Sequence, residues 1–267
     1  MQVTFDSQPA PGQPVNEDLA MAGPRFAFVL DGATAPDGVD SGCEHNVAWL
    51  VSRLGGGLAR LLVRDQAATL PETLAAAITR VRAQHANTCD LNNPDSPSST
   101  VAIMRETPGT IDYLVLADSP IVIRATAGTV TPFSDHRNDY LPGYTPEIVR
   151  SHRNVPGGFW VASTKPEAAH EAITGSLPAG TITTAGIFSD GASRLAERHC
   201  MSWGQLLDLL EQEGPSRVIA EVRRADQRVE PGTYRGKPHD DATSLLCRFP
   251  VTKAQPSKAT FDTGIAL

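Results

Sequence analysis

The 267-residue sequence lacks the features that mark several large classes of protein. Its four cysteines, at 43, 89, 200 and 247, include no Cys-x-x-Cys pair, so their spacing suggests neither a zinc site nor a disulfide framework. No apolar run approaches the roughly 18 residues that a membrane-spanning helix needs. The N-terminal stretch, MQVTFDSQPAPGQPVNED, has neither the basic nor the apolar segment of an export signal. We therefore expect a cytoplasmic protein with reduced cysteines.

An excess of basic residues is also missing. The chain has 23 Lys and Arg against 30 Asp and Glu, a formal net charge of −7. This balance argues against binding to nucleic acid or to an anionic membrane surface. The hydrophobic content of 40% and the charged content of 20% are those of an ordinary globular domain. We expect a single domain over residues 1–250 and a loose tail over residues 251–267.

What the sequence does contain is an apolar strand that ends in an aspartate. This pattern occurs three times, at Asp31, Asp118 and Asp190. A carboxylate at the end of a buried strand is held at the rim of the core, where it needs a partner or a cation. Gly32 follows the first of these strands, and without a Cβ its backbone carbonyl can approach a ligand closely.

If these strands share a pair of sheets, several acids would converge at one rim: Glu17, Asp18, Asp31, Asp118, Asp190 and Asp240. So many carboxylates cannot all stay ionised together without cations between them. Oxygen ligands without clustered His or Cys favour Mg²⁺ or Mn²⁺ over zinc. Two such ions can generate a hydroxide for attack at phosphorus, so the pattern suggests metal-assisted phosphoester hydrolysis. The simpler alternative is that each acid only caps a turn.

The remaining periodicity predicts an α+β fold. Helical spacing predicts helices over 44–64, 71–87, 166–174, 203–212 and 215–229. Strands are expected over 2–5, 19–22, 25–30, 158–163, 182–189 and 244–249, with an antiparallel meander over 99–132. The strands over 19–22 and 25–30 should form a hairpin across a Gly-Pro turn. The long irregular segment over 133–158 is typical of a functional flap.

Six short motifs, in this order, resemble the metal-dependent phosphatases of the protein phosphatase 2C family. They are Asn16-Glu17-Asp18, Phe28-Val29-Leu30-Asp31-Gly32, Ser99-Thr100-Val101-Ala102, Ala117-Asp118-Ser119, Phe188-Ser189-Asp190-Gly191 and Asp240-Asp241-Ala242-Thr243. The resemblance covers about residues 3–249 and is that of a divergent bacterial-type member. It implies a four-layer α-β-β-α sandwich, in which two antiparallel sheets are flanked by pairs of helices. It also implies a serine/threonine phosphoprotein phosphatase whose partner is a phosphorylated protein.

The same resemblance implies roles for individual residues. Asp31 would bridge two central Mn²⁺ or Mg²⁺ ions, and a hydroxide between the ions would be the nucleophile. The remaining ligands would be Glu17 and the carbonyl of Gly32 for one ion, Asp190 and Asp240 for the other, and Asp118 with Asp190 for a possible third ion. Asp18 and Asp241 would lie just outside the ligand set. We expect the protein to be a monomer.

Several positions depart from the family pattern, including Ala33-Thr34 in place of a histidine or glycine pair, Ala117 in place of glycine and Asp241 in place of asparagine. Gln13 stands where family members usually carry an arginine that grips the substrate phosphate, and Pro120 replaces the arginine of the usual Gly-Asp-Ser-Arg motif. Loss of a bidentate donor weakens phosphate binding, and Arg194 is a candidate to supply the missing cation. Two alternatives therefore stay open: a weak or inactive scaffold with the phosphatase fold, and a phosphatase of a small phosphorylated metabolite.

Overall fold

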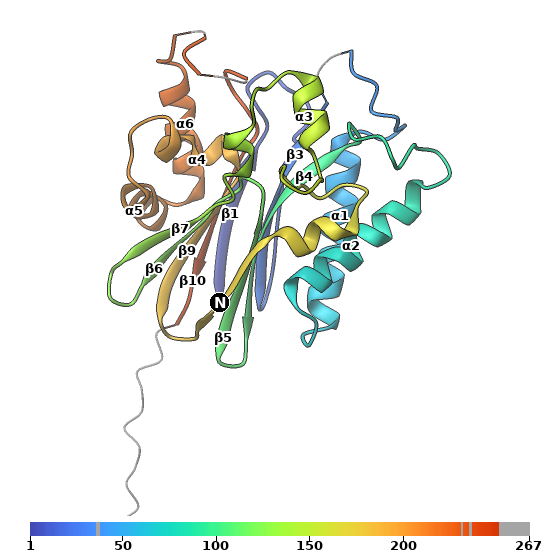
Figure 1. Cartoon of the computed structure of the whole chain (residues 1–267). Coiled ribbons are helices and arrows are strands. Elements are labelled where there is room, and N and C mark those ends of the chain that lie inside the picture. Colours follow the sequence, from blue (N-terminus) through green and yellow to red (C-terminus); the bar gives the residue numbers. More distant parts are fainter. Residues whose placement is uncertain (36–37, 231, 235–236, 251–267) are drawn as a thin grey trace, which may run out of the picture.

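Two antiparallel five-stranded sheets pack face to face in the computed structural model, which describes residues 1–35, 38–230, 232–234 and 237–250 (Figure 1). The first sheet has the order β1 (Gln2–Gln8), β10 (Ala242–Arg248), β9 (Ile182–Phe188), β6 (Ile121–Ala125) and β7 (Val130–Phe133). The second has the order β2 (Leu19–Gly23), β3 (Phe26–Ala33), β4 (Ser98–Thr107), β5 (Thr110–Leu116) and β8 (Ile173–Pro178). The tail expected over 251–267 lies outside the described residues.

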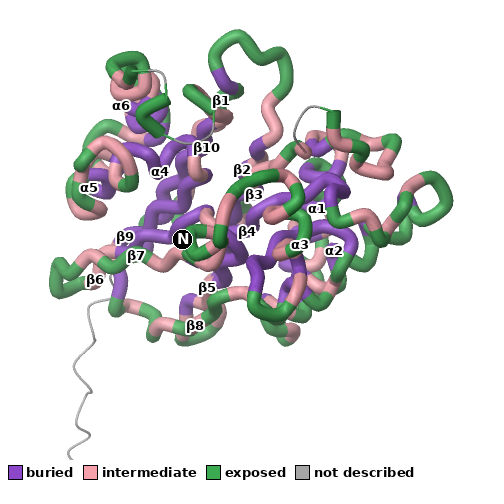
Figure 2. The backbone as a smooth tube through the Cα atoms, turned by 45° about the horizontal axis from the view of Figure 1, so that its top comes forward, coloured by how far each residue is buried: buried purple, intermediate pink, exposed green. Residues whose placement is uncertain are grey.

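Helices cover the outer face of each sheet and complete the sandwich. The helices α1 (Val47–Arg64) and α2 (Leu70–His85) pack on the second sheet, and α4 (Asp190–Glu197), α5 (Trp203–Glu213) and α6 (Pro215–Asp226) pack on the first. Three apolar layers result, one between the sheets and one under each group of helices. Figure 2 shows the buried strands in the middle of the molecule and exposed segments at its periphery. The predicted α-β-β-α sandwich is confirmed.

The helix boundaries follow from local chemistry. The side chain of Asn46 accepts a hydrogen bond from the backbone N–H of Trp49 and begins α1. Thr69 and Glu72 form a capping box at the start of α2, where a proline also occupies the first turn. Among the described residues, no helix has the combined length and apolar character that crossing a bilayer requires.

The predicted hairpin of β2 and β3 is confirmed, but β3 does not stop before Asp31. Asp31 and Gly32 continue the strand by pairing with Thr100 and Ser99 of β4. The predicted meander over 99–132 is wrong, because β5 and β6 belong to different sheets. Between these strands Ala117 has a φ of 65°, and the chain crosses the sandwich there instead of turning back.

Two further predictions about single elements were wrong, and two elements were missed. Residues 158–163 make only isolated bridges, and the helix expected over 166–174 is a 3₁₀ helix at Pro166–Glu171. The edge strand β8 was missed because it is mostly exposed and contains glycine and proline. The helix α4 was missed because its eight residues are too few for a clear helical period.

The flap segment is partly helical. It contains a 3₁₀ turn at Arg137–Tyr140 and the short helix α3 (Pro146–His152), which lies at the top in Figure 1. Phe159 and Val161, just beyond it, pack with Leu141 and Val149 in a small separate apolar cluster. The flap is therefore anchored to the sandwich at the end that carries the acidic residues.

The three consecutive glycines of α1 differ in their surroundings, and this generates a stability prediction. A Cβ on Gly55 would collide with Leu19 of β2, whereas Gly56 and Gly57 face open space. We expect Gly56→Ala and Gly57→Ala each to raise the free energy of unfolding by about 0.5–1 kcal/mol, because glycine is a poor helix former. Gly55→Ala should instead lower it by about 1–3 kcal/mol through overpacking. Urea unfolding followed by circular dichroism measures all three, and equal effects at the three sites would contradict this account.

Candidate metal centre

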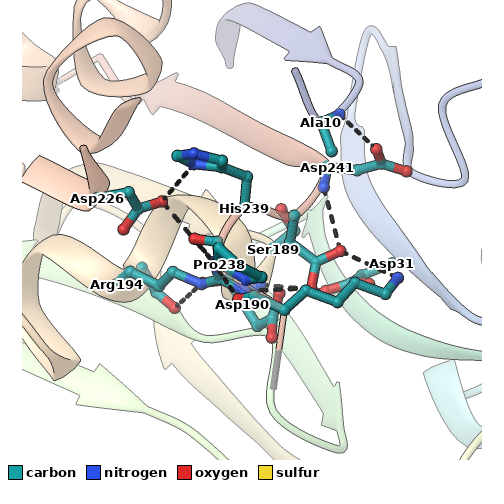
Figure 3. Close-up of polar contacts among 12 residues, drawn as sticks. Ala10, Asp31, Ser189, Asp190, Arg194, Asp226, Pro238, His239 and Asp241 are labelled. Atoms are coloured by element: carbon teal, nitrogen blue, oxygen red, sulfur yellow. Dashed lines mark hydrogen bonds and ion pairs between the residues drawn. The ribbon is translucent and has the colours of Figure 1, made fainter. Parts of the chain in front are cut away.

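The candidate centre is built around Asp31, where the two sheets meet at one end of the sandwich. Asp31 lies near the end of β3, and its Oδ2 accepts a hydrogen bond of 3.1 Å from the backbone N–H of Asp190, the first residue of α4 (Figure 3). Burial raises the pKa of Asp31 well above its usual range, and the charges of Asp18, Asp190, Asp118 and Asp240 raise it further. The structure thus brings five predicted aspartates together.

The neighbouring carboxyls show the same effect. Burial raises the pKa of Asp18 to about 7 although Thr243 donates a hydrogen bond of 2.7 Å to its Oδ2. Burial and the charges of Asp240 and Asp118 raise the pKa of Asp190 to about 7. Burial also raises the pKa of Asp118. Burial and the neighbouring charges both disfavour the ionised forms of these acids, and a divalent cation would offset that penalty.

Glu17 and Gly32 lie beside each other, next to this group. Thr34 Oγ1 is 2.7 and 2.6 Å from the two carboxylate oxygens of Glu17 and donates to that carboxylate. A Cβ on Gly32 would collide with Val47 and with the backbone oxygen of Glu17. The glycine therefore permits the close approach of β3 to the segment that carries Glu17.

The carboxylate of Asp241 tethers two segments of the backbone. Its Oδ1 accepts a hydrogen bond of 2.7 Å from the backbone N–H of Ala10, and its Oδ2 accepts one of 2.6 Å from the backbone N–H of Glu17. Gly191 in α4 leaves room for the Asp241 carbonyl, which a Cβ there would strike. Asp241 thus holds the N-terminal loop at Ala10 (Figure 3) and the backbone of Glu17 against the closing strand.

Neither candidate for contacting a substrate phosphate lies free in the centre. The side chain of Arg194 is only 2% exposed, and its guanidinium forms ion pairs with Asp240 at 3.1 Å and with Asp226 at 3.7 Å. It also donates to the carbonyls of Lys237 and Pro238 at 3.4 Å each (Figure 3). This arrangement contradicts the idea that Arg194 substitutes for the missing arginine.

Gln13 is exposed, and its backbone N–H closes a turn onto the carbonyl of Ala10 at 2.9 Å. It therefore belongs to the loop that Asp241 tethers.

A cleft of about 640 Å³ opens beside Asp118 and Asp190 and adds residues that sequence reasoning missed. Glu197, an exposed residue, lines it together with Asp118 and Asp190. The signal for Glu197 was its position two helical turns after Asp190, which places both on one face of α4. Arg198 also lines the cleft.

Two further neighbours had no recognisable sequence signal. Asn138 of the flap donates a hydrogen bond of 2.6 Å to Oδ2 of Asp118. The Nζ of Lys237 lies 3.5 Å from Oδ1 of Asp240, and the lysine side chain is 64% exposed. Lys237 is thus a solvent-facing cation beside the acidic group.

The donor atoms indicate the kind of ion that the centre suits. The clustered groups are carboxylates, supplemented by the backbone carbonyls around them, and such hard oxygen donors fit Mg²⁺ or Mn²⁺. A sandwich of two antiparallel sheets with an acidic group at one end is the arrangement that the resemblance to metal-dependent phosphatases implied.

Comparison with known proteins agrees with that class. The family model described as "Protein phosphatase 2C" matches residues 16–223, so the chain belongs to the protein phosphatase 2C family. A comparison with curated proteins found no match.

Solved structures share the fold at low sequence identity. The serine/threonine phosphatase PstP/Ppp of Mycobacterium tuberculosis superposes with a TM-score of 0.59 at 17% identity, over 93% of this chain and 98% of that one. PppA of Pseudomonas aeruginosa gives 0.58 at 21% identity, over 93% and 97%. Stp1 of Staphylococcus aureus gives 0.60 at 13% identity, over 93% and 95%.

The raised pKa values predict how pH changes the stability of the metal-free protein. Asp18 and Asp190 have a pKa of about 7 in the folded state against 3.8 in the unfolded chain, so the folded state binds more protons between these values. The free energy of unfolding should therefore fall as the pH rises from about 4 to about 7. Asp31→Asn should make the metal-free protein more stable at about pH 8, by about 1 kcal/mol or more, because it removes a repelled charge.

Urea unfolding in the presence of a chelator measures this effect, and Asp208→Asn is the matched control because Asp208 is a half-exposed residue that forms an ion pair with Arg124. The free energy of unfolding of the control should match that of the wild type at each pH measured. An Asp31→Asn protein that is less stable than the wild type at about pH 8 would show that the carboxylates do not repel one another.

Proposed function

We propose that this protein is a metal-dependent phosphatase that hydrolyses phosphoserine and phosphothreonine in proteins. The observation that carries the proposal is the convergence of Asp18, Asp31, Asp118, Asp190 and Asp240 from separate elements of both sheets, with the pKa of Asp31 raised by burial and by the other four charges. A carboxylate group of this kind costs stability unless cations occupy it, so a binding task accounts for its presence.

The ligand assignment follows the family pattern. Asp31 would contact two Mn²⁺ or Mg²⁺ ions, Glu17 and the carbonyl of Gly32 would complete one site, and Asp190 and Asp240 the other. Asp118, fixed by Asn138, would join Asp190 at a third site. Such ions supply an activated water at neutral pH and stabilise charge on a phosphoryl group. One solved neighbour, the catalytic domain of PstP, contains two manganese ions.

The protein's own residues would hold this geometry. Arg194 keeps Asp240 in place by an ion pair inside the structure, and Thr34 fixes the carboxylate of Glu17. Asp18 is fixed by Thr243 and Asp241 by two backbone N–H groups, so both support the ligands from outside the set. Positioned ligands keep the reorganisation needed during the reaction small.

Substrate phosphate would be held by cations other than those of the usual pattern. With Gln13 in place of arginine and Arg194 held inside the structure, the cations that remain beside the acidic group are Lys237, next to Asp240, and Arg198, in the cleft with Asp118 and Asp190. A single lysine binds phosphate as a point charge and lacks the bidentate geometry of arginine. We therefore propose modest affinity for phosphate. We also propose that the protein is a monomer that acts in the cytoplasm.

Hydrolysis of para-nitrophenyl phosphate with Mn²⁺ tests the proposal. The wild type should be active, and Asp31→Asn should lower kcat by a factor of about 100 or more, because both ions lose a shared ligand. Asp208→Asn on the surface of α5 should retain full activity. An inactive wild type that still binds Mn²⁺ by calorimetry would overturn the phosphatase assignment and leave a scaffold.

A second experiment tests how phosphate is held. Gln13→Arg should lower KM several-fold by adding a bidentate donor, and Lys237→Ala should raise KM by a factor of about 3–10 through the loss of one charge. The matched control is Lys165→Ala, since Lys165 donates to the carbonyl of Asn154 away from the acidic group. Both variants should be assayed on a phosphothreonine peptide and on a sugar phosphate. A preference for the sugar phosphate would contradict the phosphoprotein assignment.

A further inference from the structure

A second cluster of possible metal ligands lies away from the carboxylates, at the end of the α1–α2 pair. It consists of Cys43, His45, His85 and Cys89, whose candidate ligand atoms all lie within 4.8 Å of one another. Among the described residues, these four form the one group of His, Cys, Asp and Glu side chains that meets this distance condition. None of the four belongs to the site described above.

The sulfur–nitrogen distances match those of a tetrahedral zinc site. Cys43 Sγ lies 3.7 Å from Nδ1 of His45 and 3.5 Å from Nδ1 of His85, and Cys89 Sγ lies 3.4 Å from Nδ1 of His45. Zinc bonds of about 2.3 Å to sulfur and about 2.0–2.1 Å to nitrogen, at tetrahedral angles, place sulfur and nitrogen about 3.5 Å apart. All three observed separations fall close to that value.

The backbone around the cluster is arranged to bring two chain segments together. Cys43 and His45 lie just before α1, and His85 is the last residue of α2. The backbone N–H of Asp90 donates to the carbonyl of Gly42 at 2.7 Å, which joins the two segments directly. Gly42 has a φ of 64°, which favours glycine, and its missing Cβ leaves room for Asn93.

The side chains themselves have no better partners. His85 is only 2% exposed, its Nε2 has no hydrogen-bond partner among the described residues, and its Nδ1 faces the Cys43 thiol. Hydrogen bonds from Cys43, Thr88 and the two histidines outweigh burial and lower the pKa of Cys89 to about 6. The ring of Trp49 stacks on His45 at 3.9 Å between centroids. Two thiols and two imidazoles beside an aromatic ring form a typical environment for a metal ion that prefers sulfur and nitrogen ligands.

We propose that Cys43, His45, His85 and Cys89 together bind one Zn²⁺ ion in a closed structural site. Two thiolates and two imidazoles fill a tetrahedral zinc shell and leave no position for water, so the site stabilises structure and performs no catalysis. This proposal differs from the expectation drawn from the cysteine spacing, which suggested no zinc site.

The zinc site would also steady one edge of the carboxylate centre. His45 lines a pocket of about 170 Å³ together with Glu17 and Thr34, the pair that forms the outer side of that centre. By joining the segment before α1 to the segment after α2, zinc would restrict the chain that borders Glu17. The inference does not depend on the proposed phosphatase activity.

A disulfide between the two cysteines is the competing arrangement. Their Sγ atoms lie 2.6 Å apart, and both cysteines are free. A disulfide would need them to approach to about 2.05 Å, whereas zinc needs them to move apart to about 3.7 Å. A disulfide would leave the buried His85 without a partner for either ring nitrogen, which favours zinc.

The first test is the metal content of the untagged protein, purified under reducing conditions without added metal. We expect about one zinc ion per chain, bound through dialysis and released by an organomercurial that blocks thiols. Cys43→Ser and Cys89→Ser should each lower the zinc content about tenfold or more, while Cys200→Ser, at an exposed cysteine outside the cluster, should leave it unchanged. Asp31→Asn should also retain the zinc, which separates this site from the carboxylate centre.

A second measurement on the wild type removes any dependence on how the variants fold. Replacement of the metal by Co²⁺ should produce the strong visible bands of a tetrahedral site. It should also produce thiolate-to-cobalt charge-transfer absorption, which carboxylate ligands cannot give. Zinc-free protein without these bands would overturn the proposal. So would a thiol titration of the unfolded, unreduced protein that finds Cys43 and Cys89 oxidised to a disulfide.

Discussion

The clustering of five aspartates, whose charges repel one another, is the constraint on which the rest of this structure depends. Asp31 lies where the two sheets meet, and the charges of four other aspartates raise its pKa beyond the effect of burial. A hydrophobic sandwich gains nothing by collecting these carboxylates, because each is penalised when ionised away from water. Bound divalent cations, as proposed above, would offset this penalty.

The fold resists this repulsion with fixed donors. Asp31 receives a backbone N–H from the first residue of α4, Asp18 receives the hydroxyl of Thr243, and Asp240 is paired with Arg194. The three apolar layers of the sandwich hold the strands that carry these groups in place. The proposed zinc site would add a second constraint on the side of α1 and α2, beside Glu17. The protein would then have two kinds of metal site. The oxygen ligands would bind the ions for catalysis, and the sulfur and nitrogen ligands would bind one ion that stabilises the fold.

Arg194 shows why chemical type alone does not identify a functional residue. Its position just after Asp190-Gly191 suggested a phosphate ligand. In the structure Arg194 is buried, and its guanidinium forms ion pairs with Asp226 and Asp240. Lys237, which no motif marks, is the cation that faces solvent beside Asp240. The difference lies in side-chain direction, which depends on how α4 packs against α6 and the segment before β10.

The sequence by itself determined the layered α+β fold, the hairpin of β2 and β3 and most of the acidic group, because apolar periodicity and the order of strand–aspartate motifs are local features. It could not determine that β5 and β6 lie in different sheets, since an antiparallel pair and a crossover begin with the same apolar strands. Only the tertiary structure joined Cys43-x-His45 to His85-x-x-x-Cys89, because about forty residues of two helices separate the halves, and no local spacing encodes their contact. Position in space, set by packing over long sequence separations, decided which acids, cations and thiols became neighbours.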